Sequence, residues 1–151
     1  WGYMAVSGAT TMWERWNSDV GDLSMNSYNH YAFGAVVGFF YRRLAGIAPA
    51  SPGFRRISVR PLWLPAVGAV SARYESAVGP IATRVDGDSD GISCLELAVP
   101  PNCVAEVELP ARFDWEESGD ALGNCAGLLT LGVDGSLLRA EIGSGQYRFT
   151  R

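Results

Sequence analysis

The sequence has no lysine, one histidine and three cysteines among its 151 residues. All twelve basic residues are therefore arginines, and sixteen acidic residues bring the net charge to −4 at pH 7. Residues 1–65 hold six arginines and three acids, whereas residues 66–151 hold six arginines and thirteen acids. Nucleic acids bind to concentrated basic surfaces, which this distribution does not provide. A nucleic-acid partner is therefore not expected.

The three cysteines, Cys94, Cys103 and Cys125, have neither the CxxC nor the Cys/His spacing of a zinc site. Cys94 and Cys103 could pair across a hairpin, but the odd number favours reduced thiols. Reduced thiols slightly favour a cytoplasmic location over a periplasmic or secreted one. The acidic run Asp86–Gly91 lacks the twelfth-position carboxylate of a calcium loop, because that position is Leu97. An acidic turn is expected there, and no metal or cofactor is predicted.

Long hydrophobic runs are also absent. The apolar run Tyr31–Tyr41 is too short to span a bilayer and is followed by two arginines, so no membrane partner is expected. No signal peptide is visible. The chain begins with Trp1 and not with methionine, which suggests that its start is a cut and that any export signal lies upstream. Apolar residues make up 48% of the chain and charged residues 19%, which is typical of a folded globular protein.

Residues 1–47 have the pattern of one or two helices. The main helix is predicted to begin at Asn26 or Ser27 and to end at Gly46. A short helix is expected before Met12. Because apolar residues occupy nearly all faces of the main helix, it should be buried on most sides. The chain offers few other helices, so the main helix is expected to belong to a larger helical body that is missing here.

After a proline- and glycine-containing linker at residues 48–53, the hydrophobic period falls to two. Cys94–Val99 and Val104–Leu109 are predicted to pair around a turn at Pro100–Asn102. Short strands separated by turn residues favour an antiparallel β-sandwich for residues 54–151. The predicted fold class is therefore mainly β, an antiparallel β-sandwich preceded by one or two helices. The other strands are expected within residues 54–60, 70–78, 81–85, 128–133, 137–142 and 146–151.

Candidate chemistry is concentrated in two short segments of the helical part. Gly8–Trp16 places tryptophans on both sides of Glu14, and Met25–Gly34 carries His30 between two tyrosines. Aromatic faces stack on the C–H faces of a pyranose, while amide, imidazole and carboxylate groups meet its hydroxyls. A carboxylate is also the usual general base of a glycosidase. Taken singly, the carboxylate could be salt-bridged, the tryptophans could be core residues and the histidine could be structural.

Taken together, the two segments resemble the bacterial α-L-rhamnosidases. The catalytic domain of that family contains Gly-Ala-Thr-Thr-x-Trp-Glu-x-Trp followed by Met-Asn-Ser-x-Asn-His-Tyr-x-x-Gly, which match residues 8–16 and 25–34. The similarity continues through residues 41–47 and 99–102 and covers roughly residues 1–110. The resemblance is more diffuse beyond that point.

The resemblance implies a division of the chain into two parts. Residues 1–47 would be the carboxy-terminal helical segment of an (α/α)6 barrel, the six-hairpin catalytic domain of the family. Residues 54–151 would be its carboxy-terminal β-sandwich. The implied reaction is the removal of terminal α-L-rhamnosyl residues from glycosides by an inverting mechanism. The implied partners are a rhamnose-containing glycoside and the remainder of the catalytic barrel.

The resemblance also assigns roles to individual residues. Glu14 matches the general base that activates water, and His30 matches a residue that contacts the rhamnosyl unit. Trp13 and Trp16 would form walls of the same pocket. Asn29 precedes the matching histidine and would contact the sugar or cap the helix.

The general acid of the family lies in an upstream acidic segment that this sequence does not contain. The chain alone is therefore expected not to hydrolyse rhamnosides. A competing interpretation is a non-catalytic carbohydrate-binding or structural β-sandwich module. In that case Glu14 and His30 would point in unrelated directions or into packed surroundings, whereas the enzyme interpretation predicts that both face one concave, aromatic-lined surface. The β-region itself would either be a structural cap on the barrel or bind carbohydrate independently. Independent binding predicts that Trp63 and Trp115 are exposed stacking platforms.

Overall fold

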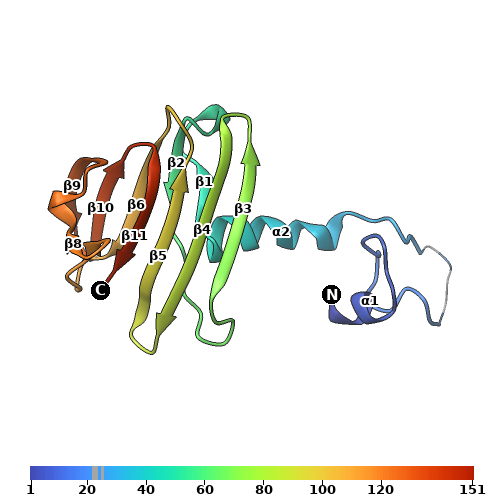
Figure 1. Cartoon of the computed structure of the whole chain (residues 1–151). Helices are drawn as coiled ribbons and strands as arrows, with labels where there is room; N and C mark the ends of the chain where they lie inside the picture. Colours follow the sequence, from blue (N-terminus) through green and yellow to red (C-terminus); the bar gives the residue numbers. More distant parts are fainter. Residues whose placement is uncertain (22–23, 25) are drawn as a thin grey trace. The chain divides into compact units, whose positions relative to one another are not determined.

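A computed structural model describes residues 1–21, 24 and 26–151. Met25, the first residue of the second motif, lies outside the described residues. The chain divides into two compact units, residues 1–39 and 40–151. The smaller unit carries both candidate motifs. The larger unit is a β-sandwich (Figure 1).

Helical structure is confined to the first 44 residues and to short turns. Helix α1 spans Gly2–Val6, as the short helix expected before Met12. The later helical stretch consists of η1 (Ala32–Ala35), α2 (Val36–Phe39) and η2 (Phe40–Leu44). None of the helices in the described residues has the length and apolar character that crossing a bilayer requires.

The predicted start of the main helix at Asn26 or Ser27 is wrong, because the helical stretch begins at Ala32. The physical reason is a competing set of hydrogen bonds. The backbone N–H groups of Glu14 and His30 are used in bonds between the two motif segments. Residues that pair in this way cannot form the i to i−4 bonds of a helix.

The end of the helical stretch agrees with the prediction. Gly46 follows η2 with φ of +78°, a conformation that residues with a Cβ rarely adopt. A Cβ atom there would lie 2.4 Å from the backbone nitrogen of Pro61. Gly46 therefore both stops the helix and permits the close approach of the Arg60–Pro61 backbone.

The expected burial of the main helix is not found within this chain. Val37, Phe39 and Phe40 are each more than 40% exposed. Helices that are apolar on most faces are stable in proteins when other elements cover them. Within the described residues, these side chains therefore keep a large exposed surface.

The larger unit contains two stacked β-sheets, as predicted for residues 54–151 (Figure 1). The five-stranded sheet has the order β1-β2-β6-β10-β9, and the six-stranded sheet has the order β3-β4-β5-β11-β7-β8. The strands are β1 Ile47–Pro49, β2 Arg56–Val59, β3 Val70–Ser76, β4 Gly79–Asp88, β5 Gly91–Val99, β6 Val104–Pro110, β7 Glu116–Glu117, β8 Asp120–Ala121, β9 Leu128–Asp134, β10 Leu137–Ile142 and β11 Gly145–Thr150.

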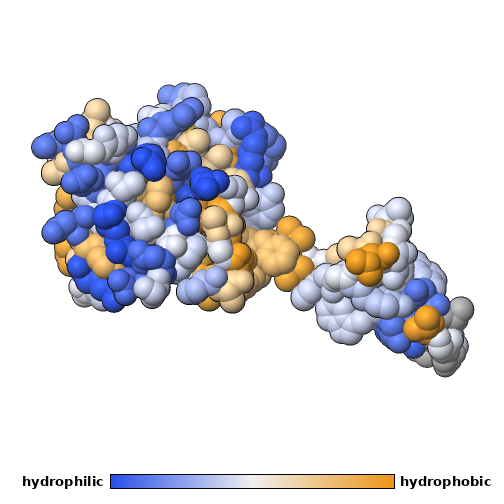
Figure 2. All heavy atoms as spheres, turned by 60° about the horizontal axis from the view of Figure 1, so that its bottom comes forward, coloured by the Kyte–Doolittle hydropathy of each residue, from blue (hydrophilic) through white to orange (hydrophobic). Residues whose placement is uncertain are grey.

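The core lies between the sheets and follows the alternation of the strands. In β5, Leu95 and Leu97 point inward while Glu96 lies on the outer face. In β6, Ala105 and Val107 point inward. Hydrophilic side chains are spread over the outer surface of the sandwich that is visible in Figure 2. This separation of faces is what the period of two predicts.

Two features of the sheets differ from the expected arrangement. Strands β5 and β6 were predicted to pair, but they belong to different sheets, and Pro100–Asn102 carries the chain from one sheet to the other. Strand β5 pairs with β4 and β11, while β6 pairs with β2 and β10. The β2–β6 pair is parallel, and all other pairs are antiparallel. Alternation specifies the inward face of a strand but not its neighbour.

The segment expected to be a linker, residues 48–53, carries regular structure. Its first two residues complete β1, which pairs with β2 through Ala48 and Ser58. A short 3-10 turn, η3, follows at Pro52–Phe54. The three cysteines are free thiols, with Cys103 and Cys125 buried.

The acidic run at residues 86–91 ends β4, forms the turn and begins β5. The Asp88 carboxylate accepts hydrogen bonds from the Asp90 N–H (2.8 Å) and from the Arg151 guanidinium (2.6 Å). The backbone hydrogen bond, followed by the charge of Arg151, holds the pKa of Asp88 below its ordinary value of 3.8. Among the described residues, no group of three or more His, Cys, Asp or Glu side chains is arranged to hold a metal ion.

Asp88→Asn is expected to make the free energy of unfolding less dependent on pH at acidic pH. The lowered pKa in the folded state means that Asp88 contributes stability above pH 3.8, and that this contribution is lost as the pH falls through the folded-state pKa. The difference in urea midpoint between the parent chain and Asp88→Asn should therefore be constant near neutral pH and should narrow below pH 3.8. Folded aspartates titrate in roughly the range from pH 2 to pH 5. A difference in urea midpoint that stays constant down to about pH 2 would contradict the lowered pKa of Asp88.

Candidate functional site

The two motif segments lie side by side in the smaller unit. The Glu14 N–H donates to the Ser27 carbonyl oxygen (2.9 Å), and the His30 N–H donates to the Met12 carbonyl oxygen (2.7 Å). The Thr11 hydroxyl donates to the Tyr28 carbonyl oxygen. These bonds pair residues 11–14 with residues 27–30 in opposite directions. Backbone hydrogen bonds at Glu14 and His30 therefore join two segments that are more than ten residues apart in sequence.

Glu14 is half-buried, and its carboxylate is anchored on the other segment. Oε2 of Glu14 accepts a hydrogen bond from the Ser27 N–H at 2.7 Å. Together with the Glu14 N–H bond to the Ser27 carbonyl, this makes a reciprocal contact between the two residues. A backbone donor cannot rotate away as a side chain can, so it restricts where the carboxylate lies.

His30 is also half-buried. Its N–H binds the carbonyl oxygen of Met12, which lies two residues before Glu14 in the first segment. Its ring stacks on Tyr31, with ring centres 5.7 Å apart and planes 9° apart. Asn29 is exposed, and its backbone N–H donates to the Ser27 hydroxyl (3.2 Å). Asn29 does not cap the helix, because η1 begins after Tyr31.

The two tryptophans have different surroundings. Trp13 is 6% exposed and packs edge-to-face against Tyr28, at 5.5 Å between ring centres. Trp16 is 45% exposed and stacks on Phe33 at 3.9 Å, with Trp1 edge-on at 4.9 Å. Trp13 therefore belongs to the core of the smaller unit, whereas Trp16 presents ring surface to its exterior.

Sequence reasoning missed one residue of this unit, Ser18. It is fully buried, and its hydroxyl and carbonyl bond to residues of both motif segments. No pattern in the sequence could have identified it, because it lies in a polar run with Asn17 and Asp19. Its burial is a consequence of the tertiary arrangement alone.

The two sandwich tryptophans that were candidates for stacking platforms, Trp63 and Trp115, do not present open ring faces. Trp115 is buried, and its indole N–H donates to the Pro110 carbonyl oxygen (2.9 Å). Trp63 is half-buried and lies against Gly87, where a Cβ atom would come within 2.7 Å of the indole ring. The Trp63 N–H donates to the Asp88 carbonyl oxygen (2.9 Å). Both tryptophans are therefore engaged in packing.

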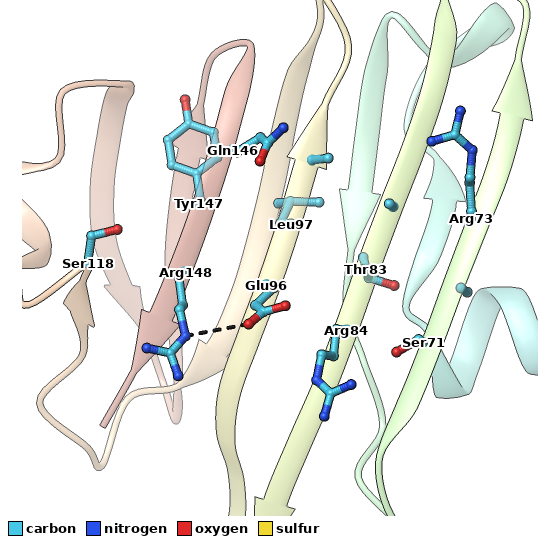
Figure 3. Close-up of a pocket in the computed structure, with 13 residues that line it drawn as sticks. Ser71, Arg73, Thr83, Arg84, Glu96, Leu97, Ser118, Gln146, Tyr147 and Arg148 are labelled. Atoms are coloured by element: carbon cyan, nitrogen blue, oxygen red, sulfur yellow. Dashed lines mark ion pairs between the residues drawn. The ribbon is translucent and has the colours of Figure 1, made fainter.

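A shallow groove of about 740 Å³ lies on the six-stranded sheet (Figure 3). Arg84, Glu96 and Arg148 lie in a row across neighbouring strands, and Arg148 pairs with Glu96 at 3.5 Å. The one aromatic residue that lines the groove, Tyr147, is 8% exposed and donates its hydroxyl to Gly143 (3.0 Å). The groove thus offers charges in alternation and no open ring face.

Comparison with known proteins places both parts of the chain in one family. The profile described as the bacterial alpha-L-rhamnosidase 6 hairpin glycosidase domain matches residues 1–44. The profile described as the bacterial alpha-L-rhamnosidase C-terminal domain matches residues 46–120. The chain belongs to the bacterial α-L-rhamnosidase family. The rhamnosidase resemblance expected from the two motifs is thereby confirmed.

The relatives are much longer than this chain. An α-L-rhamnosidase of Streptomyces avermitilis is 40% identical over 99% of the chain, which covers 14% of that protein. An α-L-rhamnosidase of Formosa agariphila is 39% identical over 73% of the chain, which covers 12% of that protein. The crystal structure of the Streptomyces avermitilis enzyme in complex with L-rhamnose superimposes with a TM-score of 0.80 at 37% identity, over 100% of this chain and 14% of that one. The chain matches the carboxy-terminal part of these glycosidases.

Proposed function

We propose that the chain supplies the general base of an α-L-rhamnosidase whose other catalytic groups lie outside residues 1–151. The proposed substrate is a glycoside with a terminal α-L-rhamnosyl residue. The observation that carries this proposal is the reciprocal contact between Glu14 and Ser27, which fixes a carboxylate beside the segment of His30. The names of the relatives, and the L-rhamnose bound in one of them, indicate the sugar.

Glu14 has the chemistry that the proposed role requires. In an inverting glycosidase one carboxyl group protonates the leaving oxygen, and a second carboxylate takes a proton from the attacking water. The C–O bond to the leaving group breaks as the water oxygen forms its bond to the anomeric carbon. The two carboxyl groups of such enzymes are about 6.5–9.5 Å apart, which leaves room for that water. Glu14 would be the second of these groups.

His30 and Trp16 would orient the sugar. The imidazole of His30 can donate or accept a hydrogen bond with a sugar hydroxyl. Trp16 is the more exposed of the two motif tryptophans and has ring surface for the C–H face of a pyranose. Trp13 would act indirectly, because it is buried and packs on Tyr28 between the paired segments.

The test is hydrolysis of an aryl α-L-rhamnoside by the complete enzyme that contains this segment, followed by NMR of the first-formed sugar. Inversion predicts that β-L-rhamnose appears first and then mutarotates. The 151-residue chain alone is expected to release no aryl alcohol, because it contributes a base without the acid. First-formed α-L-rhamnose, or turnover by the isolated chain, would contradict the proposal.

A further inference from the structure

We propose that Ser18 is a positioning residue that holds both partners of the Glu14–Ser27 contact in place. This inference rests on the proposed role of Glu14 as a base. Ser18 itself touches no reacting group in the proposal, and it acts through the two segments that it joins. Its position, four residues after Glu14 and nine before Ser27, lies in the connection between the motifs.

The hydroxyl of Ser18 fixes the backbone that follows Glu14. Oγ accepts a hydrogen bond from the Arg15 N–H (3.1 Å) and donates one to the Arg15 carbonyl oxygen (3.0 Å). The two backbone groups on either side of the Arg15 side chain are thus tied to one atom. Because the Arg15 N–H belongs to the peptide bond that begins at Glu14, this restricts the direction in which the Glu14 side chain leaves the backbone.

The carbonyl oxygen of Ser18 fixes the other partner. It accepts a hydrogen bond from the Tyr28 hydroxyl (2.8 Å) and another from the side-chain amide of Asn26. Asn26 and Tyr28 are the two neighbours of Ser27, whose N–H binds the Glu14 carboxylate at 2.7 Å. Ser18 therefore anchors the segment of Glu14 through its hydroxyl and the segment of Ser27 through its carbonyl oxygen.

Because Ser18 is buried, the loss of one of these hydrogen bonds is more costly than it would be at the surface. Ser18 is 0% exposed, so water does not replace a lost partner as it would at the surface. Misplacing a catalytic group by about 1 Å can lower the rate about 100-fold. A buried hydroxyl that connects both sides of the carboxylate contact is thus expected to affect the reaction rate more than sugar binding.

The experiment measures kcat and KM for an aryl α-L-rhamnoside with the complete enzyme and its Ser18→Ala variant. We expect kcat to fall about 10- to 100-fold while KM changes less than about threefold. Unchanged kcat in a folded variant would overturn the proposal.

A second variant covers the case in which Ser18→Ala fails to fold. Tyr28→Phe removes one bond to the Ser18 carbonyl and keeps the ring that packs on Trp13. We expect a fall in kcat of about 3- to 10-fold, in line with the loss of one hydrogen bond of about 1 kcal/mol. The matched control is Tyr41→Phe, which removes a tyrosine hydroxyl that donates to the Arg73 carbonyl (3.1 Å) in the sandwich. Equal effects of the two substitutions would overturn the proposal.

The Glu14→Gln background separates this inference from the proposed function. If Ser18 acts through Glu14, Ser18→Ala should cost less than about twofold once Glu14 has been replaced. A full additional loss in that background would show a general structural role and overturn the positioning role. Near-normal turnover by Glu14→Gln would instead remove the proposed function, whatever Ser18→Ala does.

Discussion

Replacing Glu14 with glutamine is expected to lower the kcat of the complete enzyme for an aryl α-L-rhamnoside by about 10²–10⁴-fold. Glutamine has the same shape, and its amide oxygen can still accept the hydrogen bond from the Ser27 N–H. It cannot take a proton from water at neutral pH. The substitution therefore removes the basic group and leaves the contact that positions it.

The matched control for Glu14→Gln is Glu75→Gln in strand β3. The Glu75 side chain is 68% exposed and pairs with Arg73 at 2.6 Å. Exposed ion pairs contribute about 0–1 kcal/mol, so this variant should keep its stability and its turnover. Initial rates of aryl alcohol release and thermal melts measure both quantities. Glu14→Gln with kcat within threefold of the parent would place the base elsewhere and return Glu14 to a structural role.

Gly46→Ala is expected to destabilise the sandwich by about 2–5 kcal/mol. Two costs add at this position. The residue has φ of +78°, which strains any side chain, and the new Cβ would lie 2.4 Å from the Pro61 nitrogen and 2.7 Å from the Arg60 carbonyl carbon. Both atoms belong to the backbone, so relief requires a shift of the segment after β2. Urea unfolding followed by tryptophan fluorescence measures the loss.

Gly53→Ala separates the two costs. Gly53 has nearly the same backbone angle, φ of +74°, but a Cβ atom there would meet nothing within 4 Å. This variant should lose only the conformational part, about 1–2 kcal/mol. The difference between the two variants then measures the steric contribution at Gly46. Equal losses at both positions would contradict the close approach between Gly46 and Pro61.

The sequence predicted the positions of the strands better than their neighbours. Alternation correctly identified Cys94–Val99 and Val104–Leu109 as parts of strands β5 and β6, because a strand has a period of two whichever sheet it joins. The same pattern could not show that β6 pairs with β2 and β10, since those partners lie about 50 and 30 residues away. Such pairings are decided by how the two sheets pack.

The candidate site was predictable only in part, and for a related reason. The motif residues were identified by their resemblance to a family, and the structure brings the two segments together through backbone bonds at Glu14 and His30. Local helix signals placed the helix start too early, because they take no account of bonds to a distant segment. Ser18 left no signal, since a buried polar residue and a solvated one have the same letter in the sequence.

The topology of the six-stranded sheet also constrains the order in which the protein can fold. Strand β11 comes last among the strands along the chain, yet it lies between β5 and β7 and pairs with both. In the five-stranded sheet, β6 pairs with β2, which precedes it in the sequence, and with β10, which follows it. Long-range pairings of this kind slow folding, because loops must close before their contacts form. During synthesis on the ribosome, both sheets would remain open until residues 137–150 have emerged, so the sandwich is expected to assemble late and in one step.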